Sequence, residues 1–322
     1  MTIYRPSFVS IVIPTYNGYN DLKNLFPVIF NQKTNFQFEV ICVDSSSKDR
    51  SYELFANYPV KVCTIPQSEF SHGGTRNLGI SKSNGEIIVL ITQDALPTDD
   101  FWLENIIRNY ADPSVAGVYC RQLPKPDGTL LPKIDLSLWI TGLNVRRVNR
   151  IQDHPDYQNY PPLMKREICN FDDICSSIRR SVWEKHQFRE VNFAEDLDWS
   201  KRVFQDGYTL VFEPKAKVVH SHDRTFKYEV KRAIITYWVL FEIFDYIHNY
   251  GIKNLLRDVF LAPRNLRNVY PEIIQTTLSE RFRAYYIVTA RCLGQLIYSK
   301  CYRNLKETWI GRSILNWAKK GV

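Results

Sequence analysis

Apolar and polar positions alternate along the chain in two distinct ways. In the first two thirds, short β-branched runs each end in a polar loop, as buried strands of a parallel sheet do; they cover residues 8–14, 38–43, 60–65 and 86–92. The segments between them predict helices at 21–30, 52–56 and 73–81. Strands that alternate with helices predict an α/β fold, in which helices cover both faces of a mostly parallel sheet.

Beyond the fourth strand the pattern is less regular. Residues 124–162 are rich in Pro, Asp and Asn, and we expect them to form an irregular inserted flap or acceptor-side loop region. The other elements expected here are a helix at 101–110, a strand at 115–121, a return to the sheet at 168–178, helices at 180–186 and 196–205, and short strands at 209–212 and 216–220.

The last third has a helical period. Apolar side chains recur there at a spacing near 3.6, for example at Val230, Ile234, Trp238 and Phe241. We therefore expect a sheet-containing domain at residues 1–222 and a basic, amphipathic helical region at residues 223–322.

Charge is distributed unevenly between these two parts. Lys and Arg exceed Asp and Glu by 17 − 8 = +9 in residues 223–322, against 25 − 26 = −1 in residues 1–222. The excess favours an anionic partner for the helical region, and the absence of a recognition module favours an anionic membrane surface over nucleic acid. The alternative is a helical subdomain with solvated charges and a core of aromatic residues, with a contact between copies in a homo-oligomer.

Composition excludes two classes of protein. With 44% apolar and 14% aromatic residues, the chain is neither disordered nor a small disulfide scaffold. The seven Cys are odd in number and form no C-x-x-C pair, which favours a reduced, cytoplasmic setting. The first residues do not resemble a signal peptide, and no apolar stretch reaches the roughly 20 residues of a membrane span. We expect a protein that can touch a membrane without crossing it.

Four polar loops follow predicted strands or open predicted helices, at residues 15–18, 44–49, 71–77 and 92–94. Ligands of open parallel sheets bind beyond the carboxyl ends of the strands, where helix N-termini and loop amides gather. Since these loops carry Asp44, Arg76 and Asp94, we predict a nucleotide-diphosphate site there. The alternative is that their polar residues only cap turns and helices.

The order of these segments resembles family 2 glycosyltransferases with the GT-A fold. The segments that carry the resemblance lie within residues 9–222 and are VSIVIPTYNG, EVICVDSSSKD, FSHGGTRNLGI, EIIVLITQDALP, CSSIRRSVW and FAEDLDWSKRVFQDGY. FSHGGTRN and VVHSHDRT are most similar to bacterial rhamnosyltransferases of polysaccharide and O-antigen assembly. The resemblance implies a nucleotide-sugar donor, which could be dTDP-rhamnose.

The resemblance also implies a donor site. Its residues would be Pro14, Thr15, Tyr16, Asp44, Ser46, His72, Arg76, Gln93 and Asp94. Pro14 to Tyr16 would line the base, and Asp44 would accept a hydrogen bond from the base imide. Arg76 would neutralise the diphosphate, because its planar fork matches phosphate oxygens. The alternatives are a helix cap for Asp44, a surface ion pair for Arg76 and a structural role for His72.

Thr92-Gln93-Asp94 stands where the family carries Asp-x-Asp, and it lacks the first carboxylate. Asp94 could still bind a divalent cation, Mg²⁺ or Mn²⁺, because phosphates and water can complete the shell. His222, or less favourably His220, would be a second ligand, and imidazole suits Mn²⁺ better than Mg²⁺. Polar residues at a strand end are the alternative for the two His.

Glu195-Asp196, before an amphipathic helix, is the strongest catalytic candidate. An inverting transfer needs a carboxylate to accept the acceptor hydroxyl proton, and we predict Asp196 as this base with Glu195 orienting the acceptor or the loop. The alternative is that both residues only cap the helix. Acceptor contacts are expected from Arg179, Arg180 and Trp199; the alternatives are solvated Arg side chains and a Trp in the core.

The chain carries no Gln-x-x-Arg-Trp after Glu195-Asp196, a motif that processive members of the family usually have. We therefore expect an inverting, non-processive transferase on the cytoplasmic face of the membrane, acting on a lipid-linked glycan. Two competing functions remain, a nucleotidyltransferase and a non-catalytic nucleotide-sugar-binding protein. The missing Gly-rich phosphate loop disfavours the first, and Thr92 in the metal motif favours the second.

Overall fold

The computed structural model describes residues 6–191, 193–302 and 308–320. The chain forms two compact units. The first contains Met1–Leu123, Trp139–Tyr160 and Lys165–His220, and the second contains Pro124–Leu138, Pro161–Met164 and Ser221–Val322.

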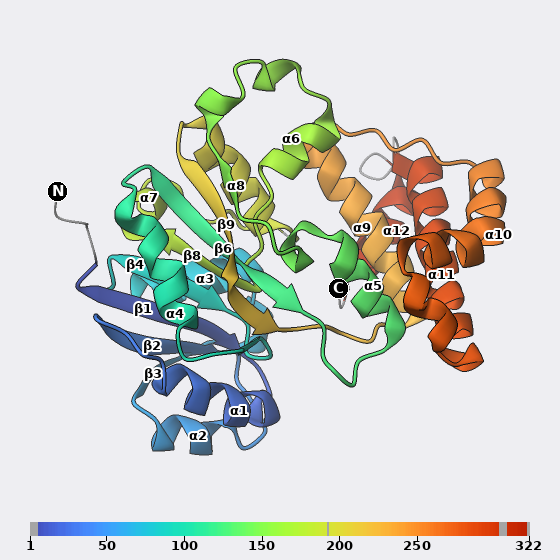
Figure 1. The fold of residues 1–322 in the computed structure, drawn as a ribbon. Helices are drawn as coiled ribbons and strands as arrows, with labels where there is room; N and C mark the ends of the chain where they lie inside the picture. The colour runs from blue at the N-terminus through green and yellow to red at the C-terminus, as the bar shows by residue number, and fades with distance from the viewer. Residues whose placement is uncertain (1–5, 192, 303–307, 321–322) are drawn as a thin grey trace. The chain divides into compact units, whose positions relative to one another are not determined.

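In the first unit, the described residues form one nine-stranded sheet in the order β3-β2-β1-β4-β8-β6-β9-β5, with β7 also paired to β9 (Figure 1). The strands are β1 (Phe8–Thr15), β2 (Gln37–Asp44), β3 (Val60–Thr64), β4 (Ile87–Ile91), β5 (Leu96–Pro97), β6 (Val115–Leu123), β7 (Arg147–Asn149), β8 (Cys175–Arg179) and β9 (Thr209–Val219). β1 to β4, β6 and β9 run in one direction, and β5, β7 and β8 run in the other.

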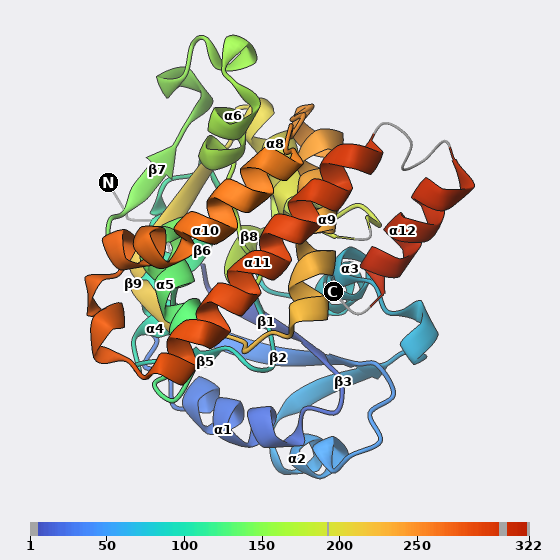
Figure 2. The ribbon, with the colours of Figure 1, turned by 90° about the vertical axis from the view of Figure 1, so that its right-hand side faces the viewer.

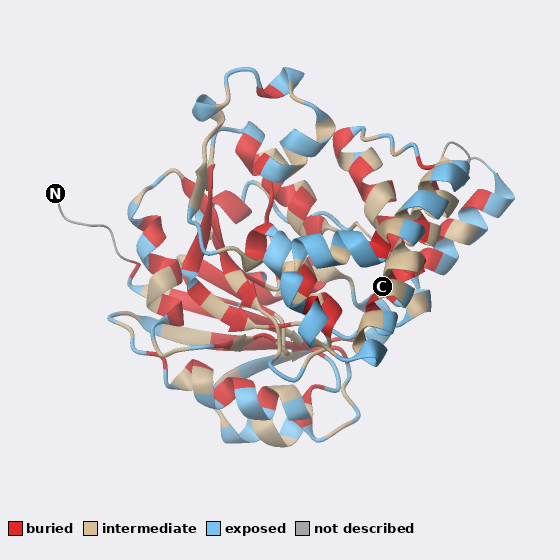
Figure 3. Cartoon of the chain, turned by 45° about the vertical axis from the view of Figure 1, so that its right-hand side comes forward, coloured by how far each residue is buried: buried red, intermediate tan, exposed pale blue. Residues whose placement is uncertain are grey.

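Helices cover both faces of this sheet. They are α1 (Tyr19–Phe30), α2 (Ser51–Asn57), α3 (His72–Ser81), α4 (Trp102–Ile107), α7 (Arg180–Trp183) and α8 (Glu195–Gln205). α1 and α4 share one buried cluster with alternate residues of β1, β2 and β4. α3 lies against the other face, where Gly79 approaches Val12 and Val43 so closely that a larger side chain would not fit. Figure 3 shows the central strands as buried.

The α/β class expected from the sequence, with helices on both faces of a mostly parallel sheet, is confirmed. The region 124–162 is irregular only in part, because it contains α5 (Leu130–Leu138) and β7, and α6 (Pro162–Ile168) begins at its last residue. The two short strands expected at 209–220 are one strand, β9. Its pairing with β6 jumps from Cys120↔Glu213 to Arg121↔Lys217, so a bulge accommodates the Pro214 interruption without ending the strand.

The second unit is helical, as the period of its sequence predicts. Besides α5, its helices are α9 (Phe226–Phe244), α10 (Ile252–Val269), α11 (Leu278–Cys301) and α12 (Trp309–Lys319). α11 lies beside α9 and α10 (Figure 2). Arg291 of α11 makes ion pairs with Glu229 of α9 and Asp135 of α5, at 2.8 Å and 2.7 Å. These buried or half-buried charges fix the three helices together.

Short 3₁₀ segments connect the regular elements at Gln67–Glu69, Arg108–Ala111, Ile140–Gly142, Ile151–Asp153, Tyr157–Asn159 and Pro271–Gln275. None of the helices in the described ranges is both long and apolar enough to cross a membrane. All seven Cys are free thiols.

Candidate active site

The strand directions bring several polar loops to one edge of the sheet. β1, β2, β4, β6 and β9 end at this edge, and β8, which is antiparallel to β4 and β6, begins there. The loops after Thr15, Asp44 and Ile91 therefore adjoin the segment 172–174 and the residues that follow β9. This carboxyl edge is where an open α/β sheet binds its ligand.

Asp44, at the end of β2, is buried and organises the first two loops. Its carboxylate accepts hydrogen bonds from Thr15 Oγ1 (3.1 Å), Ser47 N (2.9 Å) and Ser47 Oγ (2.5 Å). A carboxylate accepts about four hydrogen bonds, so one more donor can be accommodated. Asp44 does not cap α2: Asp49 instead accepts hydrogen bonds from Ser51, at the start of that helix.

The Gln93 side chain joins the end of β4 to the loop after β1. Its Oε1 accepts a hydrogen bond from Tyr16 N (2.9 Å), and its Nε2 donates one to Tyr16 O (3.2 Å). Gly18 lies against this amide, and a Cβ there would collide with it. The Tyr16 side chain is exposed, while Pro14 is partly buried below it. Ser46 is exposed, and its hydroxyl donates a hydrogen bond to Ile65 O (2.8 Å).

Arg76 of α3 does not lie where a donor diphosphate could reach its guanidinium. It is only 5% exposed, and it pairs with Glu195 (2.5 Å) and Asp173 (3.6 Å). It also donates to His72 O (3.1 Å), while the half-buried His72 ring lies edge-on to Phe70. We therefore correct the diphosphate assignment and the surface-pair alternative: Arg76 is a buried cation that positions carboxylates.

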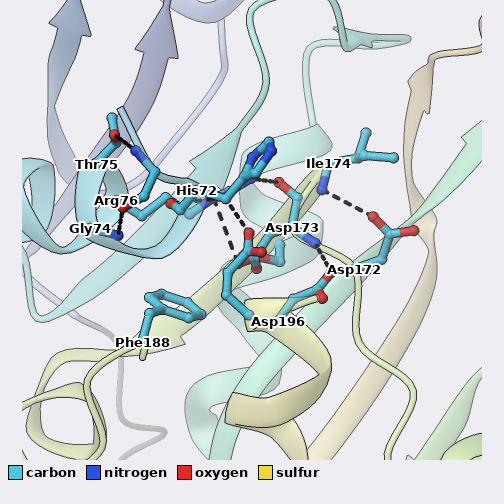
Figure 4. Close-up of polar contacts among 12 residues, drawn as sticks. His72, Gly74, Thr75, Arg76, Asp172, Asp173, Ile174, Phe188 and Asp196 are labelled. Atoms are coloured by element: carbon cyan, nitrogen blue, oxygen red, sulfur yellow. Dashed lines mark hydrogen bonds and ion pairs between the residues drawn. The ribbon is translucent and has the colours of Figure 1, made fainter. Parts of the chain in front are cut away.

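Glu195 and Asp196 join this cluster from the first turn of α8. Figure 4 shows Asp196 close to Asp173 and to the Arg76 side chain. Asp196 accepts hydrogen bonds from Leu197 N (2.7 Å) and Asp173 N (3.3 Å). Burial, reinforced by the charge of Glu195 and opposed by Arg76, raises the pKa of Asp196 to about 6. A carboxylate with this pKa accepts a proton near neutral pH more readily than an ordinary Asp.

Asp173 is the most strongly perturbed carboxyl group of the cluster. Burial raises its pKa to about 8, against the opposing effect of Arg76. Ser176 Oγ donates to its Oδ1 at 2.6 Å. The raised pKa weakens the ionisation of Asp173, and Glu195, at 2.5 Å, is the nearer of the two carboxylate partners of Arg76.

The backbone before α8 adopts an unusual conformation. Ala194 has φ = 61°, in the left-handed region that residues other than Gly rarely adopt. Ala194 is the N-cap residue of α8, but its methyl side chain cannot accept a hydrogen bond from the backbone N–H groups of the first helical turn, and α8 has no side-chain cap at this position. Backbone strain of this kind clusters at functional sites, where the surrounding structure holds it.

Asp94 and two His form a second group at the end of β9. Asp94 Oδ2 lies 3.6 Å from His220 Nε2. His222 follows only two residues later, so the short chain keeps it nearby, and one possible ligand atom from each of the three lies within 4.8 Å of the others. A carboxylate and two imidazoles are ligands that suit Mn²⁺ or a similar divalent ion. The residues therefore fit a cation site, in which His220 belongs as well as His222.

The three residues expected to contact the acceptor, Arg179, Arg180 and Trp199, do not join the polar groups at the carboxyl edge. Arg179 pairs in register with Ile87, at the opposite edge of the sheet, and donates to the carbonyls of Val115, Tyr110 and Asp112. Arg180 donates to Gly85 O (2.6 Å) and Ser83 Oγ (2.7 Å). Trp199 is fully buried against Phe171 and Phe188. We correct all three assignments, because these side chains satisfy the fold and present nothing to an acceptor.

Three residues of this edge were not predicted from the sequence: Gln122, Asp172 and Asp173. Gln122 is the penultimate residue of β6, and the two Asp lie shortly before β8. From the sequence, both Asp were expected inside a strand at 168–178, so neither was considered as a site residue. Only the antiparallel direction of β8 places that pair at the carboxyl edge.

Comparison with known proteins agrees with this architecture. Residues 10–187 match the family model described as "Glycosyl transferase family 2". The chain is 32% identical over 319 residues to the O-antigen chain rhamnosyltransferase WbaN of Salmonella anatum, covering 94% of this chain and 97% of that protein. It is 29% identical over 317 residues to the O-antigen chain rhamnosyltransferase RfbN of Salmonella typhimurium, covering 92% and 97%.

Among solved structures, a similar fold occurs in the mannosyltransferase PcManGT from Pyrobaculum calidifontis, in complex with GDP-Man and Mn²⁺. The TM-score is 0.57 at 16% identity, and the match covers 94% of this chain and 89% of that one. Residues 1–349 of Staphylococcus aureus TarS give a TM-score of 0.53 at 15% identity, covering 92% and 91%.

Proposed function

The chain belongs to glycosyl transferase family 2, and from that premise we propose that it is an inverting, non-processive enzyme that transfers one sugar from a nucleotide diphosphate to a hydroxyl of a lipid-linked glycan. It is a glycosyltransferase. We propose L-rhamnose, carried by dTDP, as the sugar. The support is that both Salmonella relatives, matched over nearly their whole length, are O-antigen chain rhamnosyltransferases.

The observation that carries the proposal is the buried cluster around Arg76. The Arg76–Glu195 pair, at 2.5 Å, fixes the first turn of α8 and so holds Asp196 at the carboxyl edge with a pKa of about 6. In the reaction, Asp196 removes the proton of the acceptor hydroxyl, whose oxygen bonds to the sugar C1. The bond from C1 to the diphosphate oxygen breaks, and its electron pair leaves with the nucleotide diphosphate. Attack opposite the leaving group inverts C1.

The leaving diphosphate needs positive charge, and Arg76 is too deeply buried to supply it. We propose that Asp94, His220 and His222 hold a divalent cation for this purpose, Mn²⁺ or Mg²⁺. Such an ion neutralises charge that develops on the leaving oxygen. The support is the mixed carboxylate and imidazole ligand set, together with the Mn²⁺ in the PcManGT complex.

The nucleoside would lie over the loops after β1 and β2. Asp44 would accept the base imide N–H with its remaining acceptor position, and Pro14, Thr15 and Tyr16 would line the base. Ser46 and Gln93 stay in the proposed donor site as residues that shape these loops, and His72, at the start of α3, stays as a residue that supports the segment before that helix. The bonds of Gln93 to Tyr16 and of Asp44 to Ser47 support this placement, because they hold both loops before a ligand arrives.

We further propose that the second unit docks on the anionic cytoplasmic face of the membrane, where a lipid-linked acceptor would lie. On α10, Ile252, Leu256 and Phe260 are 59%, 64% and 82% exposed at a spacing of four residues. Exposed basic residues accompany them along the same helix, at Lys253, Arg257 and Arg264. Arg257 also pairs with Asp258 (2.8 Å). Apolar and basic side chains side by side suit an anionic bilayer, whereas a second copy would bring like charges together.

A donor panel tests the reaction. The full chain is incubated with Mn²⁺ and each of dTDP-rhamnose, UDP-glucose, UDP-GlcNAc and GDP-mannose, and release of nucleoside diphosphate is measured with and without a membrane extract that contains acceptor. We expect slow release from dTDP-rhamnose alone and faster release with acceptor. Release only from another donor would overturn the choice of sugar. No release from any donor would contradict the transferase and favour a binding protein.

Sedimentation with vesicles tests the docking face. The chain should sediment with vesicles that contain phosphatidylglycerol and not with pure phosphatidylcholine. Phe260→Ser with Leu256→Ser should reduce the bound fraction, while Tyr52→Ser, at an exposed aromatic residue of α2, should leave it unchanged. Equal binding by the α10 variant would contradict this docking face.

A further inference from the structure

Gln122, the penultimate residue of β6, connects the proposed cation site to the segment that carries Asp173. Its Oε1 lies 3.3 Å from His220 Nδ1, and its Nε2 donates to Asp172 Oδ2 at 2.7 Å. On the other side of the imidazole, His220 Nε2 faces Asp94 Oδ2 at 3.6 Å. Gln122 and His220 are 5% and 6% exposed. The contact between these two side chains therefore lies in the interior of the protein.

The sheet register explains why these side chains meet. β6 and β9 are parallel, and Gln122 pairs with Val218. His220 lies two residues after Val218, and its backbone N–H donates to Leu123 O at 2.9 Å. Backbone pairing with β9 therefore fixes Gln122 directly, and the pairing with β8, which ends at Tyr119↔Ser176, brings the segment before Cys175 toward it.

The chemistry of the three groups sets the direction of each hydrogen bond. An ionised carboxylate only accepts, so the Gln122 amide must turn its NH₂ toward Asp172 and its oxygen toward His220. An amide oxygen also only accepts, so His220 Nδ1 must carry the proton. Nε2, the ring nitrogen on the side of Asp94, is then the atom that a neutral His220 would offer to a cation.

We propose that Gln122 and Asp172 are positioning residues that hold His220 in its Nδ1–H form, with Nε2 aimed at the divalent cation. This inference rests on the proposed function only for the presence of that cation. Partners of this kind orient metal-binding imidazoles and raise their basicity. Asp172 also accepts a hydrogen bond from Ile174 N at 3.0 Å, and the adjacent Asp173 N donates to Asp196. One short segment therefore supports both the cation ligand and the base.

Binding of Mn²⁺ tests the inference without turnover. Free Mn²⁺ is measured by electron paramagnetic resonance during titration of the full chain with dTDP present. Gln122→Leu should bind Mn²⁺ about 10–100-fold more weakly, the usual cost of losing such a partner. Gln32→Leu is the matched control: Gln32 is also buried and hydrogen-bonded, to Asp99 O and Leu103 N, but touches no predicted ligand. Its Mn²⁺ affinity should stay within about twofold of wild type, since no ligand partner is lost.

A reversed pair separates positioning from mere damage to the fold. Gln122→Glu places two carboxylates against each other and should weaken Mn²⁺ binding. Gln122→Glu with Asp172→Asn restores the hydrogen bond with opposite polarity and keeps an oxygen for His220 Nδ1, so Mn²⁺ affinity should return. Imidazole ¹⁵N chemical shifts of the wild type should show His220 protonated at Nδ1.

The outcomes are distinct. Unchanged Mn²⁺ affinity in Gln122→Leu, or no recovery in the folded double variant, would overturn the positioning role. A wild-type chain that does not bind Mn²⁺ with dTDP would overturn the cation site and this inference together. A chain that binds Mn²⁺ as described and yet releases no nucleotide from any donor would overturn the proposed transferase while the positioning role stands.

Discussion

The two halves of the carboxyl edge hold their polar side chains by different means. Around β1, β2 and β4, the loops are joined by hydrogen bonds to uncharged hydroxyl, amide and backbone groups, such as those of Asp44 to Ser47, three residues apart, and of Gln93 to Tyr16, 77 residues apart. Around β8 and α8, buried charges meet across long stretches of sequence: Arg76 is 119 residues from Glu195 and 97 from Asp173.

The difference separates two tasks. Loops held by hydrogen bonds to uncharged groups present fixed donors and acceptors, which suits recognition of a nucleoside. Buried charges shift one another's proton affinities, which suits proton transfer. Substitutions around β8 and α8 should therefore change turnover and stability strongly, and substitutions around β1, β2 and β4 should mainly change nucleotide affinity.

Asp196→Asn should have the largest effect on turnover. Asn keeps the shape but cannot accept the acceptor proton, so kcat should fall about 10³-fold, within the 10²–10⁴ range for general-base catalysis, while donor affinity stays within about twofold. Initial rates and donor binding by calorimetry measure the two quantities. Asp198→Asn, on the same helix and paired with Arg202, is the control and should keep near-normal turnover. Near-normal turnover in Asp196→Asn would remove this residue as the base.

Arg76→Gln should have the largest effect on stability. It leaves Glu195 buried without its cation, and breaking a buried pair in this way costs about 3–5 kcal/mol of unfolding free energy. Urea denaturation measures the loss. Arg50→Gln breaks the exposed pair with Glu53 and should leave the urea midpoint nearly unchanged. A stable Arg76→Gln chain with weakened nucleotide binding would restore the diphosphate role for Arg76.

Asp44→Asn should weaken nucleotide binding without abolishing turnover. The new NH₂ opposes the donors that the carboxylate accepts, and loss of one charged hydrogen bond corresponds to about tenfold in the dissociation constant of dTDP. Calorimetry with dTDP measures this. Asp49→Asn removes a carboxylate that only supports the loop and the start of α2, and it should keep dTDP affinity within about twofold of wild type. Equal losses in both variants would mean that Asp44 acts only on loop structure.

Asp173→Asn should have the smallest effect of the four substitutions, and the informative quantity is the change of unfolding free energy with pH. Because the pKa of Asp173 is raised to about 8, the folded chain keeps a proton that the unfolded chain loses near pH 4, so this contribution to stability declines from about pH 4 and is gone once pH has passed 8. One such proton corresponds to a loss of about 1.4 kcal/mol between roughly pH 7 and 9 in the wild type. In the Asn variant, the unfolding free energy should not show this part of the decline with pH. Parallel pH profiles of unfolding free energy would contradict the raised pKa.

The same contrast explains what could be predicted from the sequence. The parallel strands and the loops that follow them were predicted closely, because apolar runs and the polar residues after them are adjacent in the chain. Asp44 and Asp94 follow such runs, and Glu195-Asp196 was predicted from its place before an amphipathic helix. All of them lie at the carboxyl edge, and their roles stay predictions.

The errors came from contacts between distant segments. Arg76 was assigned to a diphosphate because its loop was visible and its carboxylate partners were not. Arg179 and Arg180 were assigned to an acceptor because the direction of β8 was unknown; reversing that strand moves them to the far edge. Gln122 carries no local signal at all, and only the register of β6 with β9 shows its contact with His220.

The pH dependence of kcat/KM tests most directly the claim that the buried cluster makes Asp196 the base. We predict that kcat/KM, measured at saturating Mn²⁺, falls as pH decreases through about 6, because protonation of Asp196 removes the base. The midpoint should not move with Mn²⁺ concentration, and Glu195→Gln should lower it, because the charge of Glu195 helps to raise the pKa of Asp196. A profile that stays flat down to the ordinary Asp value of about 4, or a midpoint that follows Mn²⁺, would contradict the account.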